Sequence, residues 1–219
     1  VGSQGVEYAL VAHWKASGLL TEPSAELPLQ AVDQLFAVSG SCSPTTADQI
    51  AFAESQGFQV FDFDAATAID QTALNVEVAR AKKSCLGLLS HGHDVIVATA
   101  RGPGDPAITR MLNAIEASRI SAQTAYERLA KALGKLSKEI CTQTTMPRIA
   151  ICGGDTSGHS LSALQASALT FVAPIEHGAP LCKLYSLETS GIEGLEVTLK
   201  GGQMGTPAFF VKAKGGLKS

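Results

Sequence analysis

The chain has 219 residues, a length that suits one α/β domain or one domain with a small appendage. Hydrophobic residues make up 45% of it and charged residues 17%, a composition that supports a large core and excludes a disordered chain. The formal net charge of −3, without blocks of like charge, predicts neither a nucleic-acid partner nor an anionic membrane partner, and no apolar run reaches the ~18 residues of a membrane span. The five cysteines are scattered without a CxxC pair, which argues against a disulfide framework or a zinc knuckle and favours a reduced cytoplasm.

Short apolar runs alternate with amphipathic stretches along the chain. The runs that predict strands are 35–40, 58–64, 94–100, 148–152, 168–174, 181–187 and 195–201. Helical stretches separate the first four runs, which indicates βαβ units and a mostly parallel sheet with helices on both faces. The last three runs follow one another without long helices between them, so we expect them to add edge strands, some of them antiparallel. The predicted fold is a three-layer α/β/α domain with extra C-terminal edge strands.

Helix start signals occur at four places: Ser43 with Pro44, Thr67 with Asp70, Asp105 with Pro106, and Ser121. A side-chain oxygen that accepts hydrogen bonds from the first turn, or a proline at the first helical position, is typical of a helix start. Thr67 and Asp70, three residues apart, resemble a capping box. The first, second and fourth of these helices are predicted to end near Gly57, Leu89 and Ile140.

The N-terminal region differs in character from the rest of the chain. Residues 7–17 are helix-like, and a polar, proline-containing loop follows them. We interpret residues 1–30 as a linker and docking element and residues 31–219 as the main domain. Because the chain opens at Val1 without a methionine or a signal-peptide pattern, we expect it to be a fragment or a processed product.

Three loops rich in glycine and serine follow predicted strands: 39–43 (SGSCS), 153–158 (GGDTSG) and 200–205 (KGGQMG). In an open parallel sheet, ligands bind at the carboxyl ends of the strands. Glycines allow close approach of the backbone, hydroxyls add hydrogen-bond donors, and the N-terminus of a following helix attracts anions. The three loops could therefore cradle the phosphates of a nucleotide, while the same residue types are also the commonest turn formers.

Other motif readings fit less well. Neither GxxxxGK[ST] nor GxGxxG is present, and GDTSG does not match the G-x-S-x-G of a hydrolase. Ser157 as a nucleophile would need a base, and His159 is only two residues away. The HGHD stretch at 91–94 invites a metal site, but it lies at the amino end of a predicted strand. We favour a helix C-terminus and a glycine turn there.

Six stretches, in order along nearly the whole chain, resemble the four-carbon acid sugar kinase family and specifically its C-terminal nucleotide-binding domain. They are VGSQGVEYAL, VSGSCSPTTADQI, RGPGDP, GGDTSG, EHGAPL and LEVTLKGGQMGTPAFFVKA. Some family members carry the older label Hrp-dependent type III effector. The resemblance implies an ATP-dependent kinase that phosphorylates the terminal hydroxyl of a four-carbon sugar acid such as 3-oxo-tetronate, threonate or erythronate.

The resemblance also implies a division of labour between two domains. An N-terminal domain, expected upstream of Val1, would bind the sugar acid and supply the catalytic base, so that this chain is the nucleotide-binding half. Asp155 would steer Mg²⁺, directly or through water. The residues implied to bind ATP are Ser39, Gly40, Ser41, Gly153, Gly154, Asp155, Thr156, Ser157, Gly158, Gly201, Gly202 and Gly205.

Two loops depart from the family pattern. The family usually reads GGETSG and KSGNFG, whereas this chain has Asp155 in the first motif and Gly201, Gln203 and Met204 in the second. No lysine or arginine adjoins GGDTSG, so we expect charge neutralisation from Mg²⁺, helix ends or the upstream domain. A serine hydrolase that uses Ser157 and a non-catalytic binding or effector module are the alternatives.

Overall fold

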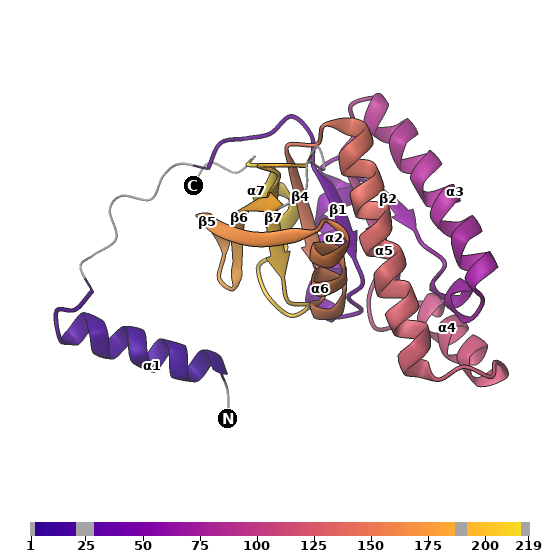
Figure 1. Cartoon of the computed structure of the whole chain (residues 1–219), viewed down its shortest axis with the longest axis horizontal. Coiled ribbons are helices and arrows are strands. Elements are labelled where there is room, and N and C mark those ends of the chain that lie inside the picture. Colours follow the sequence, from indigo (N-terminus) through magenta and orange to yellow (C-terminus); the bar gives the residue numbers. More distant parts are fainter. Residues whose placement is uncertain (1–2, 21–28, 187–191, 216–219) are drawn as a thin grey trace.

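The computed structural model describes residues 3–20, 29–186 and 192–215. Within this part, one seven-stranded sheet has the order β2-β3-β1-β4-β7-β6-β5 (Figure 1). The first five strands in that order are parallel to one another, and β6 and β5 continue the sheet antiparallel. The strand bounds are β1 Phe36–Ser39, β2 Gln59–Asp62, β3 Val95–Ala98, β4 Arg148–Cys152, β5 Ala166–Glu176, β6 Ala179–Ser186 and β7 Glu196–Lys200. The predicted mostly parallel sheet with C-terminal edge strands is confirmed.

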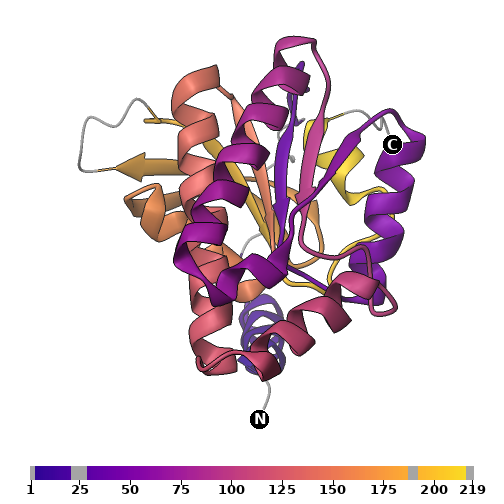
Figure 2. The same ribbon diagram turned by 90° about the vertical axis from the view of Figure 1, so that its right-hand side faces the viewer.

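Helices cover both faces of the sheet and complete the three layers (Figure 2). Their bounds are α1 Ser3–Ala16, α2 Pro44–Ser55, η1 (a 3₁₀ helix) Ala65–Ile69, α3 Gln71–Ser90, α4 Pro106–Ala117, α5 Ala122–Thr144, α6 Gly154–Ala163 and α7 Phe209–Lys214. Successive residues of β1 point to opposite faces, as the pleat of a strand requires. Phe36 packs with α3 and α5 on one face, and Ala37 packs with α2 and α7 on the other. Each face therefore has its own apolar core.

Three of the four predicted helix starts are confirmed. The Ser43 hydroxyl accepts a hydrogen bond from the N–H of Thr46 at the start of α2, and Ser121 caps α5 in the same way. Asp105 accepts from the N–H of Ala107 at the start of α4. These oxygens satisfy N–H groups that have no partner inside the helix. Gly57 follows α2 with φ +95°, in agreement with the predicted helix end.

The predicted capping box was wrong. Asp70 is itself the N-cap of α3 and accepts from the N–H of Ala73, whereas Thr67 lies inside η1, which Asp64 caps. The short 3₁₀ helix takes up these residues, so α3 begins later than the pattern suggested. A helix was expected to follow each of the loops 153–158 and 200–205, but the bounds of α6 and α7 were not predicted. The sequence of α6, GDTSGHSLSA, is rich in glycine, serine and threonine, which have low intrinsic helix propensity.

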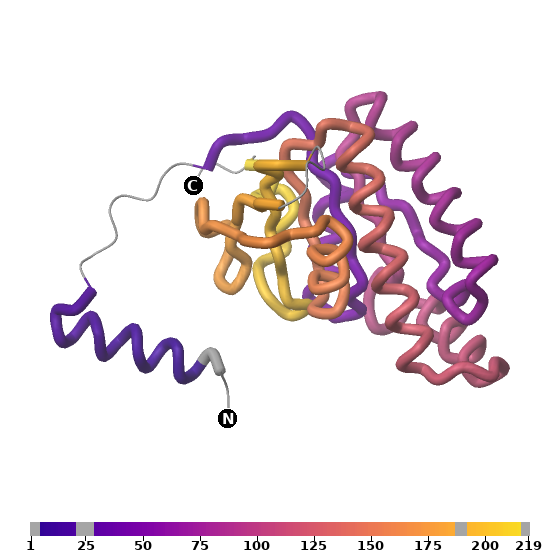
Figure 3. Tube along the Cα trace, viewed as in Figure 1, coloured from indigo at the N-terminus to yellow at the C-terminus, as the bar shows by residue number. Residues whose placement is uncertain are grey.

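Helix α1 stands apart from the sheet and its covering helices (Figures 1 and 3). Its apolar side chains Val6, Val11 and Trp14 are exposed, while the ring of Tyr8 stacks on His177 with 5.5 Å between ring centroids. His177 lies in the turn between β5 and β6, so α1 reaches the antiparallel edge of the sheet. The predicted helix at 7–17 is therefore present, shifted by a few residues. No helix in the described ranges is both long and apolar enough to span a membrane.

Candidate functional site

The two central strands β1 and β4 create a crevice at the carboxyl edge of the sheet. They are parallel neighbours, with Ser39 opposite Cys152. The chain turns after β1 into α2 on one face of the sheet, and after β4 into α6, which packs against α5 on the other face. Where the helices that follow two adjacent parallel strands go to opposite faces, the loops separate and leave room for a ligand.

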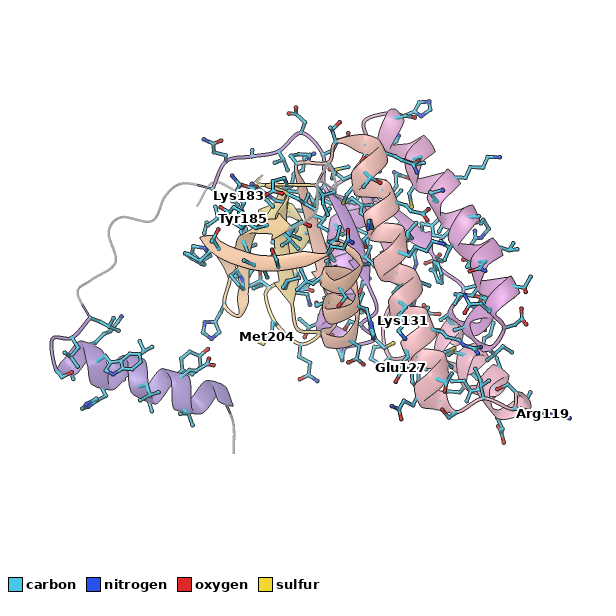
Figure 4. The ribbon with its side chains drawn as sticks, viewed as in Figure 1. Arg119, Glu127, Lys131, Lys183, Tyr185 and Met204 are labelled. Atoms are coloured by element: carbon cyan, nitrogen blue, oxygen red, sulfur yellow. The ribbon has the colours of Figure 1, made fainter. Side chains whose placement is uncertain are left out.

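The structure brings the three predicted loops side by side at this edge. The N–H of Gly40 donates to the Cys152 carbonyl at 3.0 Å, and the N–H of Gly153 donates to the Lys200 carbonyl at 2.9 Å. The hydroxyls of Ser43 and Thr46 both donate to the carbonyl of Gly202, the latter at 2.9 Å. The loops 39–43, 153–158 and 200–205 thus continue the order β1-β4-β7 beyond the strands. Met204 of the third loop lies at this end of the molecule (Figure 4).

Some of the glycines serve packing between the loops. A Cβ atom on Gly40 would lie far inside 3.0 Å of Thr156 Oγ1, and one on Gly202 would lie 2.5 Å from Ser41 Oγ. Gly153 has φ +109°, which side chains rarely adopt, and its Cβ would lie 3.5 Å from the Gly40 carbonyl carbon. Gly205 also has a positive φ, of +85°. At these four positions the packing or the backbone conformation of the protein favours glycine, whether or not a ligand is bound.

Other glycines face open space. A Cβ on Gly154 or Gly158 would meet no protein atom within 4 Å. Gly154 is the first residue of α6, and no side chain caps the N–H groups of this helix. An uncapped helix N-terminus carries free N–H donors and the positive end of the helix dipole. The start of α6 therefore presents an anion-binding surface at the crevice between β1 and β4.

The hydroxyls of the second loop are already engaged. Thr156 is buried and its Oγ1 faces Gly40, and Ser157 donates its hydroxyl to the Gly153 carbonyl at 2.7 Å. Asp155, in the first turn of α6, is exposed. Ser157 makes no hydrogen bond with His159 in the described part of the chain, so the arrangement of an activated serine nucleophile is absent there.

Lys200 is the residue that sequence reasoning missed. It ends β7 and is 1% exposed, and its Nζ donates to the carbonyls of Gly201 at 3.0 Å and Gly202 at 3.3 Å and to Thr46 Oγ1 at 3.3 Å. The Nζ atom also lies 5.5 Å from the centroid of the Phe209 ring. A lysine was sought beside GGDTSG in the sequence, whereas the Lys200 side chain lies on the α2 and α7 face of the sheet, and only its backbone carbonyl contacts that motif, through the N–H of Gly153. Register places Lys200 opposite Cys152, the residue before that motif.

The charge of Lys200 has no carboxylate partner among the ion pairs of the described residues. Burial lowers the pKa of its ammonium group because the charged form loses hydration. A buried cation held only by carbonyls and a hydroxyl is electrostatically uncompensated, and it lies behind two of the three loops. This arrangement favours a bound anion at the adjacent edge of the sheet.

The 91–94 stretch ends helix α3 and turns the chain toward β3. His91 is the C-cap of α3, where its backbone N–H donates to the Leu88 and Leu89 carbonyls, and Gly92 turns the chain with φ +81°. One ring nitrogen of His91 lies 2.7 Å from the Gly87 carbonyl. No cluster of three or more His, Cys, Asp or Glu side chains suited to a metal occurs in the described ranges. The helix C-terminus that we favoured is thus observed.

Comparisons with known proteins identify the family of the chain. The model of a family described as "Nucleotide-binding C-terminal domain" matches residues 36–210. The chain is 38% identical over 209 residues to a 3-oxo-isoapionate kinase of Paraburkholderia graminis, covering 95% of this chain and 44% of that protein. It is 29% identical over 194 residues to a D-threonate kinase of Salmonella typhimurium, covering 87% and 44%. The chain therefore spans less than half the length of these relatives.

Solved structures share the fold at low sequence identity. A Haemophilus influenzae protein superposes with a TM-score of 0.69 at 18% identity, covering 93% of this chain and 45% of that one. A Bordetella bronchiseptica protein, solved as a domain-swapped dimer with bound citrate, gives a TM-score of 0.63 at 21% identity, covering 85% and 41%. The match to the domain family extends from β1 into α7 and includes all three loops of the crevice. The chain belongs to the four-carbon acid sugar kinase family and corresponds to its nucleotide-binding C-terminal domain.

Proposed function

We propose that this chain binds ATP at the carboxyl edge of its sheet, as the nucleotide-binding part of a sugar-acid kinase. The observation that carries the proposal is the uncapped N-terminus of α6, which opens into the crevice between β1 and β4 at the edge of the sheet where Lys200 ends β7. The backbone N–H groups of Gly154 and its neighbours would hold the β- and γ-phosphates. The phosphate contacts proposed for the hydroxyls of Thr156 and Ser157 would require them to give up or share their present partners.

Asp155 is suited to help hold Mg²⁺. Its carboxylate is exposed in the first turn of α6, and Mg²⁺ prefers oxygen ligands and keeps several waters, so a single carboxylate together with phosphates suffices. The bound ion would neutralise charge on the transferring phosphoryl group. The glycines of the third loop, Gly201, Gly202 and Gly205, would contribute to the site mainly by shaping the backbone next to Ser41 and Gln49.

The acceptor of the phosphoryl group is proposed to be a four-carbon sugar acid or a close relative. Kinases of 3-oxo-isoapionate, D-threonate and 3-oxo-tetronate are among the similar proteins, and all are more than twice as long as the aligned region. We propose that the acceptor site and the catalytic base lie in a domain outside these 219 residues. Residues 1–30 would then act as the linker and docking element between the two domains, and the protein would work in the cytoplasm.

A coupled assay for ADP release tests this function. The protein containing this chain and its sugar-binding domain should release ADP, with Mg-ATP, only when its sugar acid is added. The panel should include 3-oxo-isoapionate, 3-oxo-tetronate, threonate and erythronate, with product phosphorylation checked by mass spectrometry. The isolated chain should show no sugar-dependent turnover, because it cannot position the acceptor hydroxyl. A non-catalytic effector module predicts no turnover and no nucleotide binding by either protein.

A further inference from the structure

An apolar cavity lies directly beside the first loop of the crevice. Its walls come from five parts of the chain: Gly40 and Cys42 after β1, Ala65 of η1, Thr99 and Ala100 after β3, and the N-terminal parts of α4 and α5. Most of the side chains that line it are aliphatic, such as Ile108 and Met111 of α4 and Leu129 of α5. The cavity is therefore at the same carboxyl edge of the sheet as the anion-binding start of α6.

Gly40 places the cavity next to the anion site. Gly40 lines the cavity, and it also touches the start of α6, because a side chain on it would collide with Thr156. A ligand anchored by phosphates at α6 therefore has this cavity on the adjacent side of the first loop. A nucleotide is such a ligand, with a charged end and a planar aromatic end.

The chemistry of the walls selects the aromatic end. A sugar acid carries hydroxyls and a carboxylate, and it would lose hydration in an aliphatic cavity without gaining hydrogen bonds. A nucleobase has two apolar faces and can pack between aliphatic or aromatic side chains. Tyr126 of α5 stands at the cavity with 46% of its surface exposed, so its ring is available for stacking.

We infer that this cavity, enclosed by the loops after β1 and β3 and by α4 and α5, receives the nucleobase of the bound nucleotide. The inference rests on the proposed function, because ATP that is held by its phosphates at the start of α6 can place its base in this cavity. Binding then divides into a phosphate part, supplied by backbone N–H groups at the start of α6, and a base part, supplied by side chains of α4 and α5.

Cys42 provides a reporter inside the cavity wall. It is exposed, whereas Cys85, Cys141 and Cys152 are buried, and Cys182 is partly buried on the distant strand β6. Burial of the sulfur, with a smaller effect of Asp105, raises the pKa of the Cys42 thiol, so alkylation is best measured at mildly alkaline pH. Cys182 serves as the internal control for each reaction.

Alkylation by iodoacetamide should be followed by mass spectrometry with no ligand, with Mg-ATP and with Mg-tripolyphosphate, which has phosphates but no base. Calorimetry on the same samples reports binding. We expect both ligands to bind, and only ATP to slow alkylation of Cys42 severalfold, without an effect on Cys182. Binding of both ligands without protection by ATP, or equal protection by tripolyphosphate, would overturn the base site while leaving the proposed function intact. Failure of both to bind would overturn the proposed function and this inference with it.

A filled cavity gives an independent test. Ala107 lines the cavity from the first turn of α4 and is only partly buried, so Ala107→Phe should fold. The variant should weaken ATP binding about tenfold or more, as expected when a stacked base is displaced, and leave tripolyphosphate binding unchanged. Ala117→Phe, at the exposed C-terminal end of the same helix, should change neither affinity. Unchanged ATP affinity in a folded Ala107→Phe protein, checked by circular dichroism, would contradict the inference.

Discussion

The hydroxyl oxygen of Thr156 occupies the space that a side chain on Gly40 would need. This contact joins the loop after β1 to the first turn of α6. The helices that follow β1 and β4, α2 and α6, cover opposite faces of the sheet. Thr156 is 5% exposed, so the contact is a buried part of the crevice floor. The glycine in SGSCS therefore fixes how closely the two loops approach each other.

The contact predicts a specific double-mutant result. Gly40→Ala should lower the free energy of unfolding by about 1–3 kcal/mol, the typical cost of overpacking, and weaken ATP binding. In Gly40→Ala/Thr156→Ala the colliding oxygen is removed and the nearest remaining Thr156 atom, its Cβ, is 3.4 Å away, so much of the stability should return. Urea unfolding of the two single variants and the double variant measures the coupling. Additive losses would mean that the two residues do not compete for this space.

Two helical glycines give a matched pair for the packing of α6. A Cβ on Gly134 in α5 would lie 2.6 Å from the carbonyl oxygen of His159 in α6, whereas a Cβ on Gly87 in α3 would meet nothing within 4 Å. Gly87→Ala should therefore stabilise the protein by about 0.5–1 kcal/mol through helix propensity. Gly134→Ala should instead destabilise it, because α6 must move away from α5. Equal stabilisation of both variants in urea unfolding would contradict the close approach of these helices.

Lys200 should make ATP binding depend on pH. Burial lowers the pKa of Lys200, so its ammonium group loses its proton at a lower pH than an exposed lysine does. ATP affinity should therefore fall as the pH rises through the lowered pKa of Lys200. Between the lowered pKa in the folded protein and the ordinary lysine pKa, the unfolded chain keeps the proton that the folded protein has lost. In this pH range the free energy of unfolding should therefore rise with pH. Lys200→Met should remove both effects and weaken ATP binding about tenfold, on the order expected for one partly screened charge.

Calorimetric titrations of both proteins across the alkaline range measure this dependence. Lys183, an exposed residue of β6, provides the control substitution Lys183→Met, which should retain the normal pH profile. Identical profiles in the Lys200→Met and unsubstituted proteins would show that the charge of Lys200 does not assist binding.

Local signals in the sequence predicted the sheet and most of its helices. Ser43, Asp105 and Ser121 mark helix starts because a capping oxygen acts on N–H groups only two or three residues away. The three loops were predicted to share one edge because parallel strands place their carboxyl ends together. The position of the loops after predicted strands was therefore sufficient to predict that they lie side by side.

The contacts that the sequence could not predict are those that depend on which strands are neighbours in the sheet. Lys200 and Cys152 are 48 positions apart along the chain and become neighbours only through the pairing of β7 with β4. The collision between Gly40 and Thr156 likewise requires the pairing of β1 with β4. The start of α6 inside GGDTSG was not predicted because its glycines and hydroxyl residues, which suit an anion site, also weaken the local helix signal.

The most direct test of the account is calorimetric titration of this chain with Mg-ATP, before and after the substitution Gly154→Val. A Cβ atom on residue 154 would meet no atom within 4 Å outside its chain neighbours and the backbone of α6, so the fold should be retained while the approach of a phosphate is blocked. We predict saturable binding to the unsubstituted chain and its loss in Gly154→Val, with unchanged circular dichroism. Equal affinity in the two proteins would show that the start of α6 is an ordinary turn and that the phosphates bind elsewhere.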